Sequence, residues 1–572
     1  MGRKTRALLS GLVCAAMSVS AMVQTVSAET LLKGSKLENA TTQEILADMG
    51  IGWNLGNSLD AIGSTTLSAE TSWGNPKTTQ ALISKVKSLG FNTVRIPVSW
   101  SKHVNGQYEI KEDWLNRVKE VVDYCYNEDM YVILNTHHDC QTYTSTISTT
   151  LKGYIPNSKN KEMSEKYLDT VWGQVAECFK DYDYHLIFET MNEPRLIGSG
   201  NEWWFDKNNL PSAVKDSIEC INYLNQSAVD VIRASGGYNE GRLIMCPGYD
   251  ASVDGATVSS FKLPTDISGN ENRLVVSVHG YSPYDFAMGN VAKYNATQKS
   301  NLKNWTMKPL NTTFISKGIP VVMGEFSATA AKDLEERKKW AEDYAAQASA
   351  MKLPIILWDN NAFNKKTDNG SMNSECHGYV NRSDNTVSDE QQAVLDILMA
   401  PYKALEAERK AAMPTHTEVE INCAVAGLDE SDYSIAGLRA ARIYNADNSF
   451  SANCNLNTGS SFSLDLLEDG EYMVELSADN CAAKTTSFTV VNGEQVAPVN
   501  ETINLVGDIN GDGKANTTDL MLLKRHMLFG ELGEYEQACA DTSRNGKIDL
   551  PDVSKLKRHM INIQSLWVTS YR

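Results

Sequence analysis

Eight short apolar runs within residues 30–410 constrain the fold of this chain more than any other feature. Each run is dominated by Val, Ile or Leu, which is typical of strands that are buried on both faces. Helical patterns such as Gln80–Leu89 and Trp114–Asn127 lie between them. The runs are Gly52–Leu55, Thr93–Pro97, Val132–Thr136, Leu186–Thr190, Leu243–Cys246, Val275–Val278, Pro320–Gly324 and Ile355–Trp358.

Alternation of eight strands with helices predicts an α/β fold, namely a (β/α)8 barrel, the TIM barrel. An open, doubly wound sheet is the alternative. That arrangement usually carries a glycine-rich phosphate loop after its first strand, and no such loop follows residues 52–55. The closed barrel is therefore favoured over the open sheet.

Polar and aromatic residues collect at or directly after the ends of these predicted strands. The C-terminal strand ends of a (β/α)8 barrel form the face that carries active sites. A random distribution would not place such residues at the same end of so many strands. The candidates are Arg95, His137, His138, Asn192, Glu193, His279, Tyr281, Glu325 and Trp358.

Two of the candidates are carboxylates, Glu193 after the fourth strand and Glu325 at the seventh. Hydrolysis of a glycosidic bond uses such a pair, because one group protonates the leaving oxygen while the other attacks or activates water. The two must differ in protonation at one pH, so their surroundings must differ. We expect Arg95 to keep Glu325 ionised, and His279 and Tyr281 to orient the two acids.

Each candidate taken singly also has a structural explanation. A lone glutamate at a strand end is commonly a cap or an ion-pair partner, and a lone tryptophan is commonly core. The joint pattern carries the inference, in which Asn192 would hold a sugar hydroxyl and Trp358 would offer an apolar face to a sugar ring.

Residues 415–500 alternate apolar and polar side chains with a period of two, which predicts half-buried strands. Asn492-Gly493, directly after Phe488–Val491, predicts a tight hairpin. We predict a small β-sandwich accessory module. A carbohydrate-binding role is the weaker functional hypothesis, because this region has no tryptophan. The apolar stripes are Val419, Ile421, Cys423 and Val425; Phe462, Leu464 and Leu466; and Tyr472, Val474, Leu476 and Ala478.

Residues 504–572 contain two related segments with oxygen-bearing side chains at the spacing of a calcium loop. Gly513 stands at the sharp turn of the first segment, whereas Arg544 replaces the usual small residue at position 4 of the second. A similar helical pattern follows each segment. The alternative is a pair of polar surface turns. The predicted ligands are Asp508, Asn510, Asp512, Lys514 through its carbonyl, Asn516 and Asp519, and then Asp541, Ser543, Asn545, Lys547, Asp549 and Asp552.

The N-terminal residues 1–28 have the pattern of a secretory signal peptide. Arg3, Lys4 and Arg6 precede an apolar stretch, and small residues surround Ala28. A membrane anchor is the alternative, disfavoured because the stretch is short and broken by serines. We therefore expect export.

The charge balance of 53 basic and 71 acidic residues gives a formal net charge of −18. An acidic chain has no general attraction to nucleic acid or to anionic membranes. The cysteines outside the signal peptide form no C-x-x-C pair, which disfavours a zinc site. Disulfides and buried free thiols both stay open.

The barrel region resembles glycoside hydrolase family 5, the cellulase family with two glutamates at strands four and seven. It looks most similar to the bacterial endoglucanase branch that includes xyloglucanases and mixed-linkage glucanases. The matching segments occur in the same order across residues 50–360. They are Gly52–Asn57, Thr93–Val98, Ile133–Asp139, Phe188–Arg195, Val278–Tyr284, Val322–Phe326 and Leu357–Trp358.

This resemblance implies that Glu193 is the acid/base and Glu325 the nucleophile of a retaining mechanism, with the other candidates completing the site. It implies no metal or organic cofactor for catalysis. His138 also matches and is implied to line the sugar cleft, with packing behind His137 as the alternative. The weaker candidates for neighbouring sugar subsites are Asn57, Trp53 and Trp203 or Trp204, and a core position is the alternative for each tryptophan.

The paired loops of residues 504–572 resemble a dockerin, the module that attaches cellulosomal enzymes to cohesins. Position 12 is Asp rather than the Glu of ordinary EF-hands, and no clear helix pattern precedes the first loop. The resemblance implies two structural calcium ions and a cohesin partner. Residues implied to set partner choice are Thr517, Thr518, Leu550 and Pro551.

Together the two resemblances imply an extracellular bacterial endo-β-1,4-glucanase, docked to a cellulosome and acting on cellulose or related β-glucans. The same site leaves xyloglucanase, lichenase, xylanase and mannanase activities open, since the catalytic residues are common to all of them. Loops at residues 145–161 and 199–210 are expected to discriminate. A non-catalytic glucan-binding barrel is disfavoured because both glutamates are present.

Overall fold

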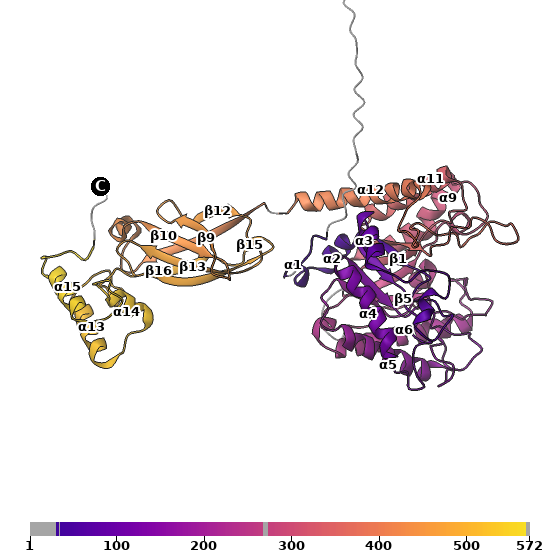
Figure 1. Ribbon diagram of the computed structural model, residues 1–572, viewed down its shortest axis with the longest axis horizontal. Helices are drawn as coiled ribbons and strands as arrows, with labels where there is room; N and C mark the ends of the chain where they lie inside the picture. The colour runs from indigo at the N-terminus through magenta and orange to yellow at the C-terminus, as the bar shows by residue number, and fades with distance from the viewer. Residues whose placement is uncertain (1–29, 34, 267–272, 414, 568–572) are drawn as a thin grey trace, which may run out of the picture. The chain divides into compact units, whose positions relative to one another are not determined.

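The computed structural model describes residues 30–33, 35–266, 273–413 and 415–567, and Figure 1 shows the path of the chain. The expected signal peptide lies outside the described residues. The chain divides into two compact units, one containing Leu46–Glu406 and the other containing Leu31–Ile45 and the chain from Ala407 onwards. The domain boundaries expected at residues 410–415 and 500–504 stay predictions.

Eight parallel strands of the first unit pair in sequence order and close into a barrel, because β1 pairs with both β2 and β8. The predicted (β/α)8 barrel is thereby confirmed. The strands are β1 (Ile51–Leu55), β2 (Thr93–Ile96), β3 (Tyr131–Asn135), β4 (Leu186–Glu189), β5 (Ile244–Ser252), β6 (Leu274–His279), β7 (Val321–Phe326) and β8 (Ile355–Asp359).

Burial on both faces explains why the barrel strands read as continuous apolar runs. Every residue of β1, β2 and β3 is buried. Gly52 stands where β1 closes the barrel against its two neighbours. A Cβ at Gly52 would lie 2.7 Å from the Ile356 side chain and 2.8 Å from the Thr93 carbonyl oxygen. Only glycine fits this seam.

Amphipathic helices cover the barrel. Thr79 caps α3 by accepting a hydrogen bond from the Leu82 amide, and α4 buries Trp114 and Val118 behind an acidic first turn. The helices of the first unit are α3 (Gln80–Ser88), α4 (Glu112–Tyr126), α5 (Lys161–Phe179), α6 (Ser212–Ala234), α7 (Val253–Thr257), α8 (Tyr284–Ala287), α9 (Ala296–Asn301), α10 (Lys308–Thr313) and α11 (Leu334–Ala350). Helix α1 (Ser35–Glu38) belongs to the second unit, and α2 (Thr42–Met49) and α12 (Asp389–Ala411) span the boundaries between the two units.

Strand β5 extends beyond the predicted end at Cys246, as far as Ser252. Its pairing with β6 shifts register between Pro247 and Ser252. Within this stretch Asp250 and Ala251 adopt left-handed backbone conformations, with φ of +60° and +46°. The irregular segment bends the strand end, a feature that apolar periodicity does not encode.

The second unit contains two sheets, in the orders β11-β10-β13-β14-β15 and β12-β9-β16, and these form the predicted sandwich. Its core includes Val419, Ile443 and Val474. Asn492 and Gly493 both have left-handed φ, as the predicted hairpin requires. The strands are β9 (His416–Val425), β10 (Arg439–Tyr444), β11 (Phe450–Asn455), β12 (Ser461–Asp465), β13 (Gly470–Ala478), β14 (Lys484–Val491), β15 (Glu494–Gln495) and β16 (Val499–Ile503).

One of the predicted stripes ends early. Phe462 and Leu464 pack against the sandwich core, but Leu466 is 45% exposed while Leu467 is buried. The strand ends at Asp465, so the alternation of faces shifts by one residue beyond it.

Three helices follow the sandwich: α13 (Thr517–Phe529), α14 (Glu534–Ala540) and α15 (Leu550–Met560). Capping boxes start α13 at Asn516 and α15 at Asp549, so the last residue of each predicted calcium loop also fixes a helix start. Leu523 and Leu556 are buried in a small core between the helices. The predicted helical module is confirmed.

All ten cysteines in the described part of the chain are free thiols, most of them buried. Within the described ranges, no helix is both long and apolar enough to cross a membrane.

Candidate active site

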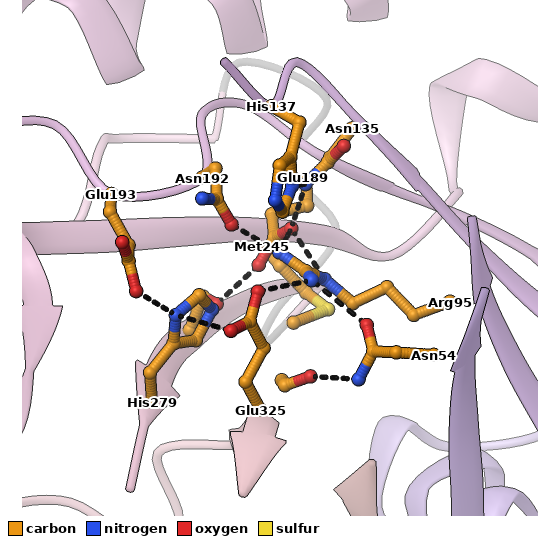
Figure 2. A network of polar contacts seen from close by, with 12 residues as sticks. Asn54, Arg95, Asn135, His137, Glu189, Asn192, Glu193, Met245, His279 and Glu325 are labelled. Atoms are coloured by element: carbon orange, nitrogen blue, oxygen red, sulfur yellow. Dashed lines mark hydrogen bonds and ion pairs between the residues drawn. The ribbon is translucent and has the colours of Figure 1, made fainter. Parts of the chain in front are cut away.

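Arg95 on β2 is fully buried and connects the polar groups at the C-terminal end of the barrel (Figure 2). Its Nη1 donates to Glu325 Oε1 at 2.8 Å and to Asn54 Oδ1 at 2.9 Å. Its Nη2 donates to Glu189 Oε2 at 2.7 Å and to Asn192 Oδ1 at 2.6 Å. One guanidinium therefore fixes side chains from β1, β4 and β7.

Glu189 is the buried counter-charge beneath this guanidinium. Its Oε2 also accepts a hydrogen bond from Asn135 Nδ2 at 2.9 Å, and its Oε1 accepts one from Ser277 Oγ at 2.5 Å. Both carboxylate oxygens thus accept hydrogen bonds. A fully buried carboxylate with these partners holds Arg95 in place rather than reacting.

The two predicted carboxylates meet at His279, which ends β6. Its Nδ1 lies 2.8 Å from Glu193 Oε1 and 3.6 Å from Glu325 Oε2. Tyr281 Oη donates to Glu325 Oε2 at 2.8 Å. One oxygen of each carboxylate and a nitrogen of His279 all lie within 4.8 Å of one another. The structure therefore brings together four residues that the sequence places at three different strands.

Burial and neighbouring charge act on the three groups in opposite directions. Burial favours the neutral form of Glu193, but the hydrogen bond from His279 and the charges of His279 and Arg195 outweigh it and lower its pKa to about 2. Burial raises the pKa of Glu325 despite the nearby His279 and Arg95. Burial disfavours the His279 cation, yet the two carboxylates raise its pKa above the ordinary value. The proton between these groups is therefore best described as shared.

His137, His138 and Trp358 form an aromatic wall beside this pair. The His137 and Trp358 rings are parallel with centroids 5.9 Å apart, and His138 packs edge-on against His137. Burial and the neighbouring His138 lower the pKa of His137 well below its ordinary value, so His137 is neutral. Trp73, which sequence reasoning missed, lies 5.5 Å from the His138 ring.

Asn57 and His138 are joined by buried Asp60, a second residue that sequence reasoning missed. The Asn57 backbone amide donates to Asp60 Oδ2 at 3.1 Å, and His138 Nε2 lies 3.6 Å from the same oxygen. Asn57 adopts a left-handed backbone with φ of +59°. Both predicted subsite residues therefore contact the same buried carboxylate.

The tryptophan candidates divide into core and surface. Trp53 is fully buried and its Nε1 donates to Asp359 Oδ2, so it is a core residue and the prediction of a sugar contact there was wrong. Trp203 and Trp204 are 59% and 70% exposed. The Arg195 guanidinium lies 3.8 Å from the centroid of the Trp203 ring.

Arg195 links that exposed loop to Glu193. It lies 3.5 Å from Glu193 Oε2 and 3.3 Å from Glu202 Oε1. Asp250 lies nearby and is buried, and its Oδ1 has no hydrogen-bond partner among the described residues. Burial and the charge of Glu193 raise the pKa of Asp250 well above its ordinary value. Arg195 directly follows Asn192-Glu193-Pro194, and this position in the sequence could have indicated that Arg195 belongs to the site.

The first predicted calcium loop has the donor geometry of a cation site. Oxygens of Asp508, Asp512 and Asp519 lie within 4.8 Å of one another. Burial and the two other carboxylates raise the pKa of Asp508 to about 6, although backbone amides of Asp512 and Gly513 donate to it. A bound divalent cation would relieve this crowding of negative charge.

The second loop repeats the same backbone pattern. Asp541 accepts hydrogen bonds from the amides of Asn545 and Gly546, as Asp508 does in the first loop. Asp549 Oδ1 is buried and lacks a hydrogen-bond partner in the described part of the chain. Both loops therefore fit calcium, and Asp552 closes the second as Asp519 closes the first.

A barrel whose C-terminal face brings two glutamates together beside a histidine has the pair of carboxyl groups that glycoside hydrolases use. The cellulase family, glycosyl hydrolase family 5, matches residues 59–364, and the dockerin type I domain matches residues 506–561. The chain belongs to glycosyl hydrolase family 5 and carries a C-terminal dockerin type I domain.

Individual relatives agree with this membership. Endoglucanase A of Clostridium longisporum is 38% identical over 422 residues, covering 71% of this chain and 73% of the relative. A lichenase from Caldicellulosiruptor sp. F32, solved in complex with cellotetraose, is 40% identical with a TM-score of 0.58 and covers 64% of this chain and 96% of that one. A broad-specificity endoglucanase from Ruminococcus champanellensis, solved with bound cellotriose, is 40% identical with a TM-score of 0.56 and covers 63% and 98%.

Proposed function

We propose that this enzyme is a retaining endo-β-1,4-glucanase that hydrolyses cellulose or related β-glucans by double displacement. The observation that carries the proposal is the close approach of Glu193 and Glu325, whose nearest oxygens lie within 4.8 Å. Retaining enzymes hold their carboxyl groups about 5–5.5 Å apart, whereas inverting enzymes leave about 6.5–9.5 Å for a water molecule. The spacing supports direct attack by one carboxylate.

Glu325 is the nucleophile in this proposal. Its two oxygens are held by Arg95 and Tyr281, which fix the carboxylate and favour its charged form. Attack on the anomeric carbon forms the glycosyl-enzyme ester and breaks the glycosidic bond. The hydrogen bond from Tyr281 Oη would keep the Glu325 carboxylate oriented during the attack.

Glu193 is the acid and then the base. Its low pKa in the substrate-free site means that the proton it needs is held by His279, whose Nδ1 lies 2.8 Å away. Transfer of that proton from His279 to Glu193 leaves a neutral imidazole and a carboxylic acid facing the leaving oxygen. Deprotonated Glu193 then takes a proton from the water that hydrolyses the ester.

The sugar contacts follow from the remaining candidates. Trp358 and His137 would form the apolar wall of the subsite at the cleaved bond, and Asn192 would hold a hydroxyl beside it. Asn57 and His138 would extend the wall. The relatives are named an endoglucanase and a lichenase, which supports a β-glucan substrate.

The C-terminal module supports an extracellular role in an enzyme assembly. We propose that the two loops bind two structural calcium ions and that the module docks into a cohesin, with partner choice set by residues 517–518 and 550–551. The signal peptide at residues 1–28 would direct export of the enzyme from the cell. Calcium takes no part in the hydrolytic step.

The deciding experiment compares wild type with Glu325→Gln and Glu193→Gln on carboxymethyl cellulose, xyloglucan, lichenan, xylan and mannan. Proton NMR of the first products should show retained configuration at the anomeric carbon for wild type. Glu325→Gln should lose about 10⁴-fold or more in kcat, as removal of a nucleophile does in other covalent enzymes.

Two outcomes would contradict the proposal. Inverted products would exclude double displacement. Glucan binding by the wild type without release of reducing ends from any of the five polysaccharides would indicate a binding protein instead. A preference for xyloglucan, xylan or mannan would change the proposed substrate, but the proposed roles of Glu193 and Glu325 would stay the same.

A further inference from the structure

The first calcium loop packs against a turn of the β-sandwich at backbone distance. Gly427 follows β9 and has φ of +67°. A Cβ at Gly427 would lie 2.1 Å from the Asp512 carbonyl carbon and 2.2 Å from the Gly513 amide nitrogen. From the other side, a Cβ at Gly513 would lie 2.4 Å from the Gly427 carbonyl oxygen. Neither position accepts a side chain, so the two backbones are in direct contact.

The contact continues along the same loop. Gly511, at position 4, would place a Cβ 3.2 Å from Asn504 Nδ2 and 3.4 Å from the Ala426 side chain. Asn504 Nδ2 donates to the Asp508 carbonyl oxygen at 3.5 Å. The loop is therefore contacted by the sandwich turn and by the segment that joins the two modules.

The second loop also contacts the sandwich, through the residue that departs from the usual pattern. Arg544 stands at position 4 with a left-handed φ of +58°. Its Nη2 donates to the carbonyl oxygen of Asp479, which follows β13, at 2.5 Å. The irregular arginine thus has a structural explanation in the neighbouring module.

The segment between the two modules is ordered rather than linker-like. Leu505 and Val506 are buried, and the Val506 amide donates to the Asn480 carbonyl oxygen. The Asn504 amide donates to Tyr535 Oη of α14 at 2.6 Å, and Trp567 Nε1 donates to the Val506 carbonyl oxygen at 3.0 Å. Sandwich and helices therefore share one continuous set of contacts.

The first loop lacks a support that the second loop has. Helices α14 and α15 flank the second loop, as in an ordinary EF-hand. The first loop is followed by α13 but is preceded by β16 and residues 504–507, where no helix is described. The Gly427 turn contacts this loop at Asp512 and Gly513 instead.

We propose that the β-sandwich is the folding base of the calcium-binding module, and that the Gly427 turn holds the first loop in its calcium-binding conformation. The sandwich thereby acts as an intramolecular docking partner in place of an entering helix. Since a ligand stabilises every part of the structure that folds together with its site, calcium should stabilise the sandwich too. The inference rests on calcium binding by the loops and is independent of the glucanase proposal.

The test uses the full-length protein with Asp541→Ala, a substitution that disables the second loop. Calcium binding to the first loop can then be measured by itself. Isothermal titration then compares this background with added Gly427→Asn or Gly530→Asn. Both glycines have φ of +67°, but a Cβ at Gly530 meets nothing within 4 Å. Asparagine tolerates this left-handed φ, so the two variants are matched in φ and differ in the clash. We expect Gly427→Asn to weaken calcium binding about tenfold or more and Gly530→Asn to change it less than about twofold.

Hydrogen exchange gives a second readout. Calcium should slow exchange in β9 and residues 426–428 of the parent protein, and this protection should be lost in Gly427→Asn. Asn504→Ala, which introduces no clash, should weaken calcium binding about two- to fivefold through loss of one hydrogen bond.

Equal calcium affinity in the two glycine variants would overturn the proposal. So would wild-type affinity of the first loop in a Gly427→Asn protein whose sandwich has unfolded, because the base would then be dispensable. Loss of calcium binding together with loss of sandwich structure supports it. In every arm, hydrolysis by the barrel reports whether the enzyme is otherwise intact.

Discussion

The barrel site and the calcium loops are built from residues at very different separations in the sequence. The Arg95 to Glu325 hydrogen bond spans 230 residues, and Trp53 to Asp359 spans 306. In the first calcium loop, the hydrogen bond from the Ile509 amide to Asp519 Oδ1 spans 10 residues. The polar groups of the barrel site are therefore placed by closure of the whole barrel, whereas the carboxylates of the loop are brought together within one short segment.

This difference teaches which perturbations each site should resist. A site held by a closed barrel is rigid without a ligand, because its carboxylates are already paired with a buried guanidinium. A site held by a short loop has carboxylates crowded together, and it needs a cation to become stable. Four predictions test the contrast, from the largest expected effect to the smallest.

Replacing Arg95 by Met should be the most damaging change in the barrel. It leaves Glu189 and Glu325 buried without their common counter-charge, which should cost about 3–5 kcal/mol of stability. Loss of the nucleophile's position should lower kcat by at least about 10³-fold. Urea unfolding and hydrolysis rates measure both effects.

The control for this variant is Arg525→Met, which removes a surface pair with Glu531 on the calcium-binding module. Such exposed pairs contribute about 0–1 kcal/mol. If Arg95→Met were no more destabilising than Arg525→Met, the barrel site would not depend on its central guanidinium.

Chelation of calcium should affect one region and spare the other. Without the ion, the crowded carboxylates of Asp508, Asp512 and Asp519 repel one another, so the helices at α13–α15 should lose structure. Circular dichroism should show a loss of helical signal, and calorimetry should show that the unfolding transition of the module with α13–α15 disappears. Hydrolysis of a soluble glucan should stay within about twofold of its original rate, because no step of the reaction uses calcium. A large fall in hydrolysis on chelation would contradict the separation of the two sites.

The pH profile of kcat/KM should be bell-shaped, because Glu325 and His279 must each be in one protonation state for the reaction. Activity should fall on the acid side as Glu325 gains a proton, at a pH above the ordinary glutamate value, because its pKa is raised. It should fall on the alkaline side as His279 loses its proton, above the ordinary histidine value.

His279→Asn tests the assignment of the alkaline limb. Glu193 alone must then hold the proton, so the alkaline limb should move to lower pH, with a fall in kcat of about 10²-fold. An unchanged alkaline limb would show that another group supplies the proton.

Arg195→Gln should have the smallest effect of the four. Removal of the cation 3.5 Å from Glu193 should raise the pKa of that carboxyl and loosen the loop at Trp203. We expect a loss of about tenfold in kcat/KM on polysaccharide. The loss should be smaller on an aryl cellobioside with a good leaving group, which needs little acid assistance. Arg195→Lys should restore most of the activity, and equal losses on both substrates would indicate a purely structural role.

Much of this molecule could be predicted from the sequence because its signals are local. Eight buried runs predict the barrel, since a strand covered on both faces must be apolar throughout. Asn492-Gly493 predicts its hairpin because both residues tolerate left-handed φ. The spacing of Asp508, Asp512 and Asp519 predicts a cation site because one short loop brings them together.

Other features depend on residues that meet only in the folded chain. Glu189 is hidden within a strand-end segment, and its role appears only when Arg95, Asn135 and Ser277 converge on it. The sequence does not distinguish a core tryptophan from an exposed one that stacks on a sugar ring. The closed barrel buries Trp53 completely.

The sequence by itself predicted the barrel, nine candidate residues at its strand ends and two loops with the ligand spacing of calcium sites. The tertiary structure alone decided which groups exchange protons, because His279 on β6 meets Glu325 through the pairing of β6 with β7 and meets Glu193 through the closure of the barrel. It also decided the contact between Gly427 and the first calcium loop. Hydrophobic periodicity and ligand spacing report what each segment can form, whereas electrostatics and close packing depend on which segments become neighbours.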